Sequence, residues 1–254
     1  MTDETRQTVN ATHTASRVLE LLHELDGAGV TELADRLDRA KSTTHGHLAT
    51  LEDHEFIVRD GDIYRLSMRF LDFAEGVKGR VGEYDIIRTE IENLAAETGE
   101  VAQFAREEHG RVVYLYKAKA DRGVETASSI GKREDMYSTG LGKAILSQLS
   151  PEQREDLLSR RELREKTANT ITDMDALHAE LERTRERGYA IDDEENILGI
   201  RCIAAPAVGD DGTVLGAISV TGPATRMTNQ RFNDELAENV RRAANVIEVN
   251  TKYS

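Results

Sequence analysis

The stretch from Thr31 to Leu66 constrains the fold more than any other part of this sequence. Apolar residues at helical spacing predict two short helices separated by a turn, and two β-type segments around an Asp-Gly turn predict a hairpin. The two helices are centred near Leu33 and Leu48 and are joined by a turn at 38–41. The hairpin strands are 56–59 and 63–66, joined by a turn at 60–62. Two helices followed by a hairpin predict a winged helix–turn–helix, whose second helix fits the major groove of DNA.

The first turns of the second helix, residues 41–47, carry side chains suited to DNA, with no acid and no large apolar group. Lysine neutralises phosphate, short hydroxyl side chains bond phosphates or bases, and histidines can read purine acceptors. Two arginines on the hairpin are expected to hold the flanking backbone. The predicted DNA-binding residues are Lys41, Ser42, Thr43, Thr44, His45, His47, Arg59 and Arg65. The alternative is a small helical core whose polar face only meets water.

Two residues of this helix carry further expectations. Ser42 is expected to cap the helix, because its side-chain oxygen can accept a backbone N–H that has no partner within the helix. Gly46 weakens a helix by roughly 1 kcal/mol relative to alanine. We interpret it as a position where the backbone approaches DNA closely.

The chain is acidic, which is unusual for a DNA-binding protein. Its 254 residues carry a net charge of −14, and residues 10–75 alone hold 13 acids and 7 bases. Only 8 of the 33 basic residues are lysine. Many acids and little lysine suggest a halophilic archaeon with a high-salt cytoplasm, where phosphate attraction is weak and base contacts carry more of the binding. The alternative is an acidic mesophilic protein.

The length suffices for one small and one medium domain. We expect a winged helix–turn–helix domain at 8–68, a linker helix at 69–82 and a larger domain at 83–254. The apolar side of the linker helix is a candidate dimer contact; the alternative is that it packs on its own chain. No apolar run reaches membrane-spanning length and no charged-then-apolar leader is present, so we expect a cytoplasmic protein that does not contact membranes.

After the linker, helices and strands come in clusters without strict alternation, which predicts an α+β domain around an antiparallel sheet. The expected strands of this domain are 101–106, 112–117, 124–128, 189–191, 201–208 and 214–220. The expected helices are 83–98, 139–149, one that starts at Pro151, 173–188 and 229–249. One further helix, 12–25, is expected before the winged helix–turn–helix motif.

No catalytic or metal site is predicted. The run 140–143 lacks the spacing of a phosphate-binding loop, and 216–219 does not form a nucleophile elbow. The 7 histidines show no paired metal-ligand spacing, and Cys202, the single cysteine, excludes an internal disulfide and a cysteine-built zinc site. We therefore expect a protein that is not an enzyme and needs no cofactor or metal.

A ligand pocket has more support. Ser219 and Thr221 alternate along one strand and so share a face. A helix opens at Gly140, where free N–H groups and the helix dipole favour an anion. The predicted effector-binding residues are Gly140, Leu141, Asp192, Cys202, Ser219 and Thr221, which together could hold a small polar acid. The alternative is that Asp192 only caps a turn.

Segments throughout the chain resemble the IclR family of transcriptional regulators. The matching segments are Arg17–Leu22, Thr31–Ala34, Lys41–Thr43, Leu48–Glu52, Tyr64–Leu66, Thr139–Ala144, Arg187–Ala190, Asp192–Glu195, Gly199–Pro206 and Ala217–Pro223. The resemblance implies a winged helix–turn–helix followed by a GAF-like effector-binding domain that takes small organic, sugar or aromatic acids. It also implies a homodimer through the DNA-binding domains and linker, often a dimer of dimers.

The resemblance places the family pocket on the six effector-binding residues named above. Thr221 stands where many members have serine, Asp38 where many have glycine, and Gly46 where many have a larger residue. Some members bind zinc in the effector domain, but nothing in these residues requires it.

The sequence thus predicts a regulator that binds double-stranded DNA, a small acid and a second copy of itself. The acid is expected to shift the dimer between geometries through the helix at 68–79. Two alternatives remain: a ligand-independent architectural DNA-binding protein, and a small-molecule enzyme with an appended helix–turn–helix, in which only Asp192 or Cys202 could carry the chemistry.

Overall fold

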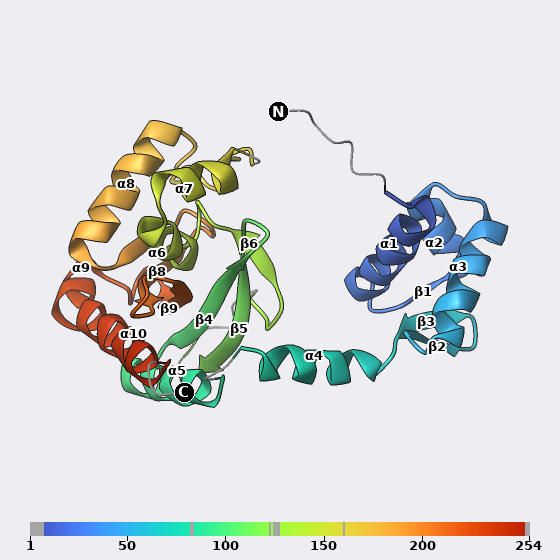
Figure 1. Ribbon diagram of the computed structural model, residues 1–254, viewed down its shortest axis with the longest axis horizontal. Coiled ribbons are helices and arrows are strands. Elements are labelled where there is room, and N and C mark those ends of the chain that lie inside the picture. Colours follow the sequence, from blue (N-terminus) through green and yellow to red (C-terminus); the bar gives the residue numbers. More distant parts are fainter. Residues whose placement is uncertain (1–7, 82–83, 122, 124–127, 160, 252–254) are drawn as a thin grey trace. The chain divides into compact units, whose positions relative to one another are not determined.

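The computed structural model describes residues 8–81, 84–121, 123, 128–159 and 161–251, and it divides into two compact units, Met1–Arg80 and Val81–Ser254 (Figure 1). Each unit has a hydrophobic core of its own. The expected strand at 124–128 falls almost entirely outside the described residues.

The N-terminal unit is the winged helix–turn–helix that the sequence predicts. Its elements are α1 (Asn10–Glu24), β1 (Ala28–Gly29), α2 (Val30–Leu37), α3 (Lys41–Asp53), β2 (Ile57–Asp60) and β3 (Ile63–Leu66). The strands form a small sheet in the order β1-β3-β2. Leu22 of α1, Leu33 of α2 and Leu48 of α3 are almost fully buried against one another in the core of this unit.

The turn between α2 and α3 is sharp, because Asp38 ends α2 in a left-handed conformation with φ and ψ both 52°. Aspartate tolerates this region better than most residues other than glycine, so Asp38 keeps a tight turn without a glycine. The predicted cap at Ser42 is wrong. The chain enters the helix earlier, with Ala40 at the N-cap and no side-chain cap, and Ser42 lies within the first turn.

The linker helix α4 (Arg69–Gly79) belongs to the N-terminal unit. Phe70 and Phe73 lie against Phe56, which directly precedes β2, and each ring centroid is 5.9 Å from that of Phe56. The guanidinium of Arg69 covers the Phe56 ring at 4.9 Å. The helix has no buried residue, and its exposed apolar side chains include Leu71, so part of its surface packs on its own chain and part does not.

The C-terminal unit is built on one six-stranded antiparallel sheet in the order β6-β5-β4-β9-β8-β7, which confirms the predicted α+β class. The strands are β4 (Val101–Glu108), β5 (Arg111–Lys119), β6 (Arg133–Asp135), β7 (Ala190–Asp193), β8 (Ile200–Val208) and β9 (Val214–Pro223). The sequence did not predict β6, because this strand is short and charged and lacks an apolar alternation.

Helices cover both faces of this sheet (Figure 1). They are α5 (Tyr84–Thr98), α6 (Gly140–Gln148), α7 (Pro151–Leu158), α8 (Met174–Arg187), α9 (Asn229–Arg231) and α10 (Ala237–Thr251), with a π-helical segment Phe232–Leu236 between the last two. Along β9, Ile218 and Val220 join the core made with α5 and α10, whereas Ala217 joins the core made with α6 and α8. Alternation along each strand therefore assigns Ser219 and Thr221 to the α6 face.

The start of α6 lies very close to the preceding chain. A Cβ atom added to Gly142 would lie 2.2 Å from the main-chain oxygen of Met136. In contrast, a Cβ added to Gly46 in α3 would meet no atom within 4 Å. Glycine is therefore a packing requirement in α6 but not in α3.

Replacing Gly142 by alanine should destabilise the C-terminal unit by about 3 kcal/mol, because backbone must shift to admit the methyl group. Gly46→Ala is the matched control and should stabilise its own unit by about 1 kcal/mol through helix propensity. Urea unfolding followed by circular dichroism measures both. An unchanged unfolding transition in Gly142→Ala would contradict the packing argument.

Candidate nucleic-acid interface and ligand cavity

The first turns of α3 present most of the predicted DNA-binding side chains to solvent. Lys41, Ser42, Thr43 and His45 are exposed and His47 is half buried. The prediction that Thr44 contacts DNA is wrong. Its side chain is fully buried, and its hydroxyl donates to the main-chain oxygen of Ala40 at 3.2 Å. It lies on the inner face with Leu48, so it belongs to the core and not to the exposed face.

The two arginines of the hairpin are half exposed and held by local contacts. Arg59 donates from Nε to the main-chain oxygen of Gly61 at 2.7 Å, and its guanidinium lies 5.5 Å from the centre of the Tyr64 ring. Arg65 donates to the main-chain oxygen of Asp26. Sequence reasoning missed Arg39, which is exposed in the turn that leads into α3.

In the C-terminal unit, a cavity of about 40 Å³ lies where the start of α6 meets the sheet. Five of the six predicted effector-binding residues line it: Gly140, Leu141, Asp192, Cys202 and Thr221. The sixth, Ser219, is fully buried and is not part of the lining. It lies two residues deeper along β9, opposite Ala204 of β8, where the core begins.

The start of α6 faces this cavity because glycine lets the helix approach the sheet. A Cβ on Gly140 would lie 3.0 Å from Sγ of Cys202. Thr139 caps the helix by accepting the N–H of Gly142 at 3.1 Å. The remaining free N–H groups and the helix dipole favour an anion at this point.

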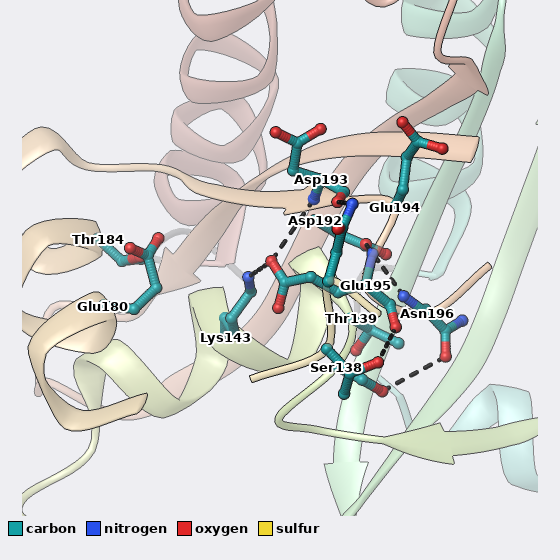
Figure 2. Close-up of polar contacts among 12 residues, drawn as sticks. Ser138, Thr139, Lys143, Glu180, Thr184, Asp192, Asp193, Glu194, Glu195 and Asn196 are labelled. Carbon is teal, nitrogen blue, oxygen red and sulfur yellow. Dashed lines mark hydrogen bonds and ion pairs between the residues drawn. The ribbon is translucent and has the colours of Figure 1, made fainter. Parts of the chain in front are cut away.

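Asp192 both caps a turn and lines the cavity. Its Oδ1 accepts the main-chain N–H groups of Glu195 at 2.8 Å and Asn196 at 3.2 Å (Figure 2). Burial raises the pKa of Asp192 to about 7, and the nearby Lys143 only partly opposes this. The carboxyl group therefore sits in a setting that tolerates its neutral form near pH 7.

Lys143 is the largest feature of α6 that sequence reasoning missed. It is fully buried, and its Nζ forms an ion pair with Oε1 of Glu195 in the loop after β7 (Figure 2). Burial raises the pKa of Glu195, and Lys143 opposes that shift. The pair fastens the start of α6 to the same loop that Asp192 caps.

Other polar side chains complete the cavity wall and were not predicted. They include Gln103 of β4, Glu134 of β6, and Asn196. A glutamine inside the apolar run of β4 was the available signal for Gln103, whereas β6 itself was missed. The thiol of Cys202 is buried and its pKa is raised to about 12, so it is poorly suited to act as a thiolate nucleophile.

The described residues offer neither a metal-binding cluster nor a membrane-spanning helix. No group of three or more His, Cys, Asp or Glu side chains in this part of the chain is arranged to hold a metal ion. Among the helices described, none combines the length and the apolar character needed to cross a membrane.

Asp192→Asn should change how stability depends on pH. The folded protein holds a proton on Asp192 that the unfolded chain has lost between about pH 4 and pH 7, so this group's contribution to stability falls as pH rises through that window. Asparagine keeps an oxygen for both backbone bonds but carries no charge. The variant should match wild type near pH 4 and exceed it by about 4 kcal/mol at pH 8 in urea unfolding, since the pKa of Asp192 rises from 3.8 to about 7 and each unit is worth about 1.4 kcal/mol. A difference that does not vary with pH would count against a buried, neutral Asp192.

Comparisons with known proteins match both units. Residues 15–61 match the IclR helix-turn-helix domain, and residues 83–249 match a family described as bacterial transcriptional regulator IclR C-terminal. A protein of Halobacterium salinarum described as "Probable HTH-type transcriptional regulator ArcR" is 36% identical over 239 residues, which cover 92% of this chain and 91% of that protein.

Solved structures agree with this assignment. The IclR of Thermotoga maritima has a TM-score of 0.78 at 27% identity and covers 95% of this chain and 98% of that one. An IclR homologue from Microbacterium hydrocarbonoxydans, crystallised with 4-hydroxybenzoate, has a TM-score of 0.80 at 23% identity and covers 96% of this chain and 100% of that one. From its two domains and its relatives, the chain belongs to the IclR family of transcriptional regulators.

Proposed function

We propose that this regulator binds its operator through α3 and that a small acid in the cavity of the C-terminal unit sets the operator affinity. The observation that carries the proposal is the cavity itself: it places the start of α6, a setting suited to an anion, beside the buried Asp192. The winged helix–turn–helix and this cavity lie in separate units. Such a division suits a protein that binds DNA with one part and senses a metabolite with the other.

The DNA-binding surface we propose consists of Lys41, Ser42, Thr43, His45 and His47 on α3, flanked by Arg59 and Arg65. The exposed part of 41–47 has no acid, although the surrounding unit is acidic. Short polar side chains at the start of a major-groove helix suit direct contacts with base edges and phosphates. Gly46 supports close approach, because the fold itself does not require a glycine there.

The effector we propose is a small carboxylic acid. The cavity volume of about 40 Å³ favours a small molecule. Its carboxylate would accept N–H groups at the start of α6. The neutral form of Asp192 can donate a hydrogen bond to it, so the two acid groups need not repel each other.

We further propose that the protein acts as a homodimer in the cytoplasm, with the exposed apolar side of α4 as part of the contact. Met68, Leu71 and Val77 leave large apolar groups exposed on or next to this helix. A dimer would present two copies of α3 to paired half-sites. The acidic composition and the Halobacterium relative support a high-salt setting.

Thr43→Val should weaken operator binding by about fivefold, the equivalent of one lost hydrogen bond. Thr44→Val is the matched control: it removes the neighbouring hydroxyl, which is buried, and should leave operator affinity unchanged. The measurement is binding to the protein's own promoter against random duplex in multimolar KCl. Equal losses for the two variants would contradict the proposed face of α3.

Thr221→Val should reduce the effect of the effector on operator affinity by about fivefold, because it removes a hydroxyl from the cavity wall while keeping its shape. Operator affinity without acid should not change. The probes are pyruvate, glycerate, gluconate and 4-hydroxybenzoate, and Thr184→Val, a buried threonine of α8 outside the lining, is the control. If no acid alters operator affinity of the wild type, the ligand-independent architectural alternative is favoured.

A further inference from the structure

The loop after β7 is held from outside the cavity by the segment 166–170, which connects α7 to α8. Three side chains of this segment donate to three consecutive main-chain oxygens, the first on the last residue of β7 and the next two in the loop. The bonds are Asn169 Nδ2 to Asp193 O at 3.1 Å, Thr167 Oγ1 to Glu194 O at 2.6 Å, and Thr170 Oγ1 to Glu195 O at 2.6 Å. We call the segment 166–170 the clasp.

The clasp is organised by its own hydrogen bonds. Oγ1 of Thr170 accepts the N–H groups of Lys166 at 3.1 Å and Thr167 at 2.9 Å, and the N–H of Thr170 donates back to the main-chain oxygen of Thr167 at 3.1 Å. Thr170 is 8% exposed. The clasp therefore forms a closed turn that presents its donors to the loop.

Lys166 joins two walls of the cavity without lining it. Its Nζ lies 2.8 Å from Oδ1 of Asn196, 3.2 Å from Oε2 of Glu134 and 3.2 Å from Oδ2 of Asp135. Asn196 and Glu134 both line the cavity, the first from the loop after β7 and the second from β6. An ammonium group has three N–H donors, which these three acceptors can satisfy.

The position of this loop decides the shape of the cavity wall. Asp192 is oriented by the N–H groups of Glu195 and Asn196, and Glu195 is paired with Lys143 at the start of α6. Displacing the loop would therefore move an acid group, an amide and the contact to α6 together. A group that holds the loop in place sets the fraction of molecules whose cavity is ready for a ligand.

We propose that Lys166 is a positioning residue for effector binding: its ammonium holds the loop after β7 and strand β6 in the arrangement that the ligand requires. This inference rests on the proposed role of the cavity. Lys166 does not line the cavity and so acts through Asn196 and Glu134. Its removal should alter ligand affinity while leaving the winged helix–turn–helix intact.

The test uses the full chain and three variants. Lys166→Met removes the charge and keeps the length of the side chain, and Lys166→Arg keeps charge and donors. Arg183→Met is the control, because it removes an exposed basic residue of α8. The readouts are hydrogen exchange of the peptide 192–197 without ligand, affinity for the four acids by calorimetry, and operator affinity without acid.

In Lys166→Met we expect the hydrogen-exchange rate of 192–197 to rise about tenfold and the affinity for the bound acid to fall about tenfold. These are the changes expected if the fraction of molecules in the binding-competent state falls to about a tenth. Lys166→Arg should restore both to within about threefold. Operator affinity without acid should be the same in all variants, which a general loss of folding would not allow.

Two results would overturn the inference: unchanged exchange at 192–197 in Lys166→Met, or wild-type acid affinity in that variant. If no acid binds the wild type, the proposed function fails and the positioning role fails with it. Exchange that still rises in that case would show that the clasp holds the loop for a different purpose, so the two failures are distinguishable.

Discussion

The approach of α6 to the sheet is the constraint on which the C-terminal unit depends. Gly140 brings the helix start against Cys202 of β8, and Gly142 lets the same turn pass the main chain at Met136. Any side chain at Gly142 would displace the helix, and the cavity lies at this junction. The anion-favouring end of α6 thus reaches the cavity only because two residues there have no Cβ.

The ion pair between Lys143 and Glu195 follows from that close approach. Removing both charges from water costs several kcal/mol for each ion, so such a pair contributes little net stability compared with apolar packing, although breaking it is costly. What it contributes is position, since it fixes the loop after β7 against α6. Asp192, Glu195 and the clasp then define one arrangement of the cavity wall, in which each polar group has a specific neighbour.

Local sequence patterns predicted most helices and strands. The cavity, in contrast, is formed by contacts between segments that are distant in the sequence. The hairpin followed from its Asp-Gly turn, and the helix expected at 173–188 ends in the structure at a left-handed Gly188. Thr44 could have been recognised as buried, because it shares helical spacing with Leu48 and Leu51. Lys143 and Glu195 are 52 residues apart, and Lys166 and Glu134 are 32 apart, so no local periodicity could reveal either contact. Ser219 was wrongly predicted to line the cavity, because alternation shows which face of the sheet a residue is on but not how far along the strand the cavity extends.

The attachment of α4 limits how a signal can reach DNA. Phe56, between α3 and β2, packs with Phe70 and Phe73, so α4 and the winged helix–turn–helix share a small aromatic cluster. A cluster of packed rings resists continuous deformation. A change in the C-terminal unit is therefore expected to move α3 together with α4 as one body, without remodelling the helix–turn–helix. In a dimer, such a movement alters the distance between the two α3 helices. Binding to paired half-sites requires that this distance match the spacing of the half-sites.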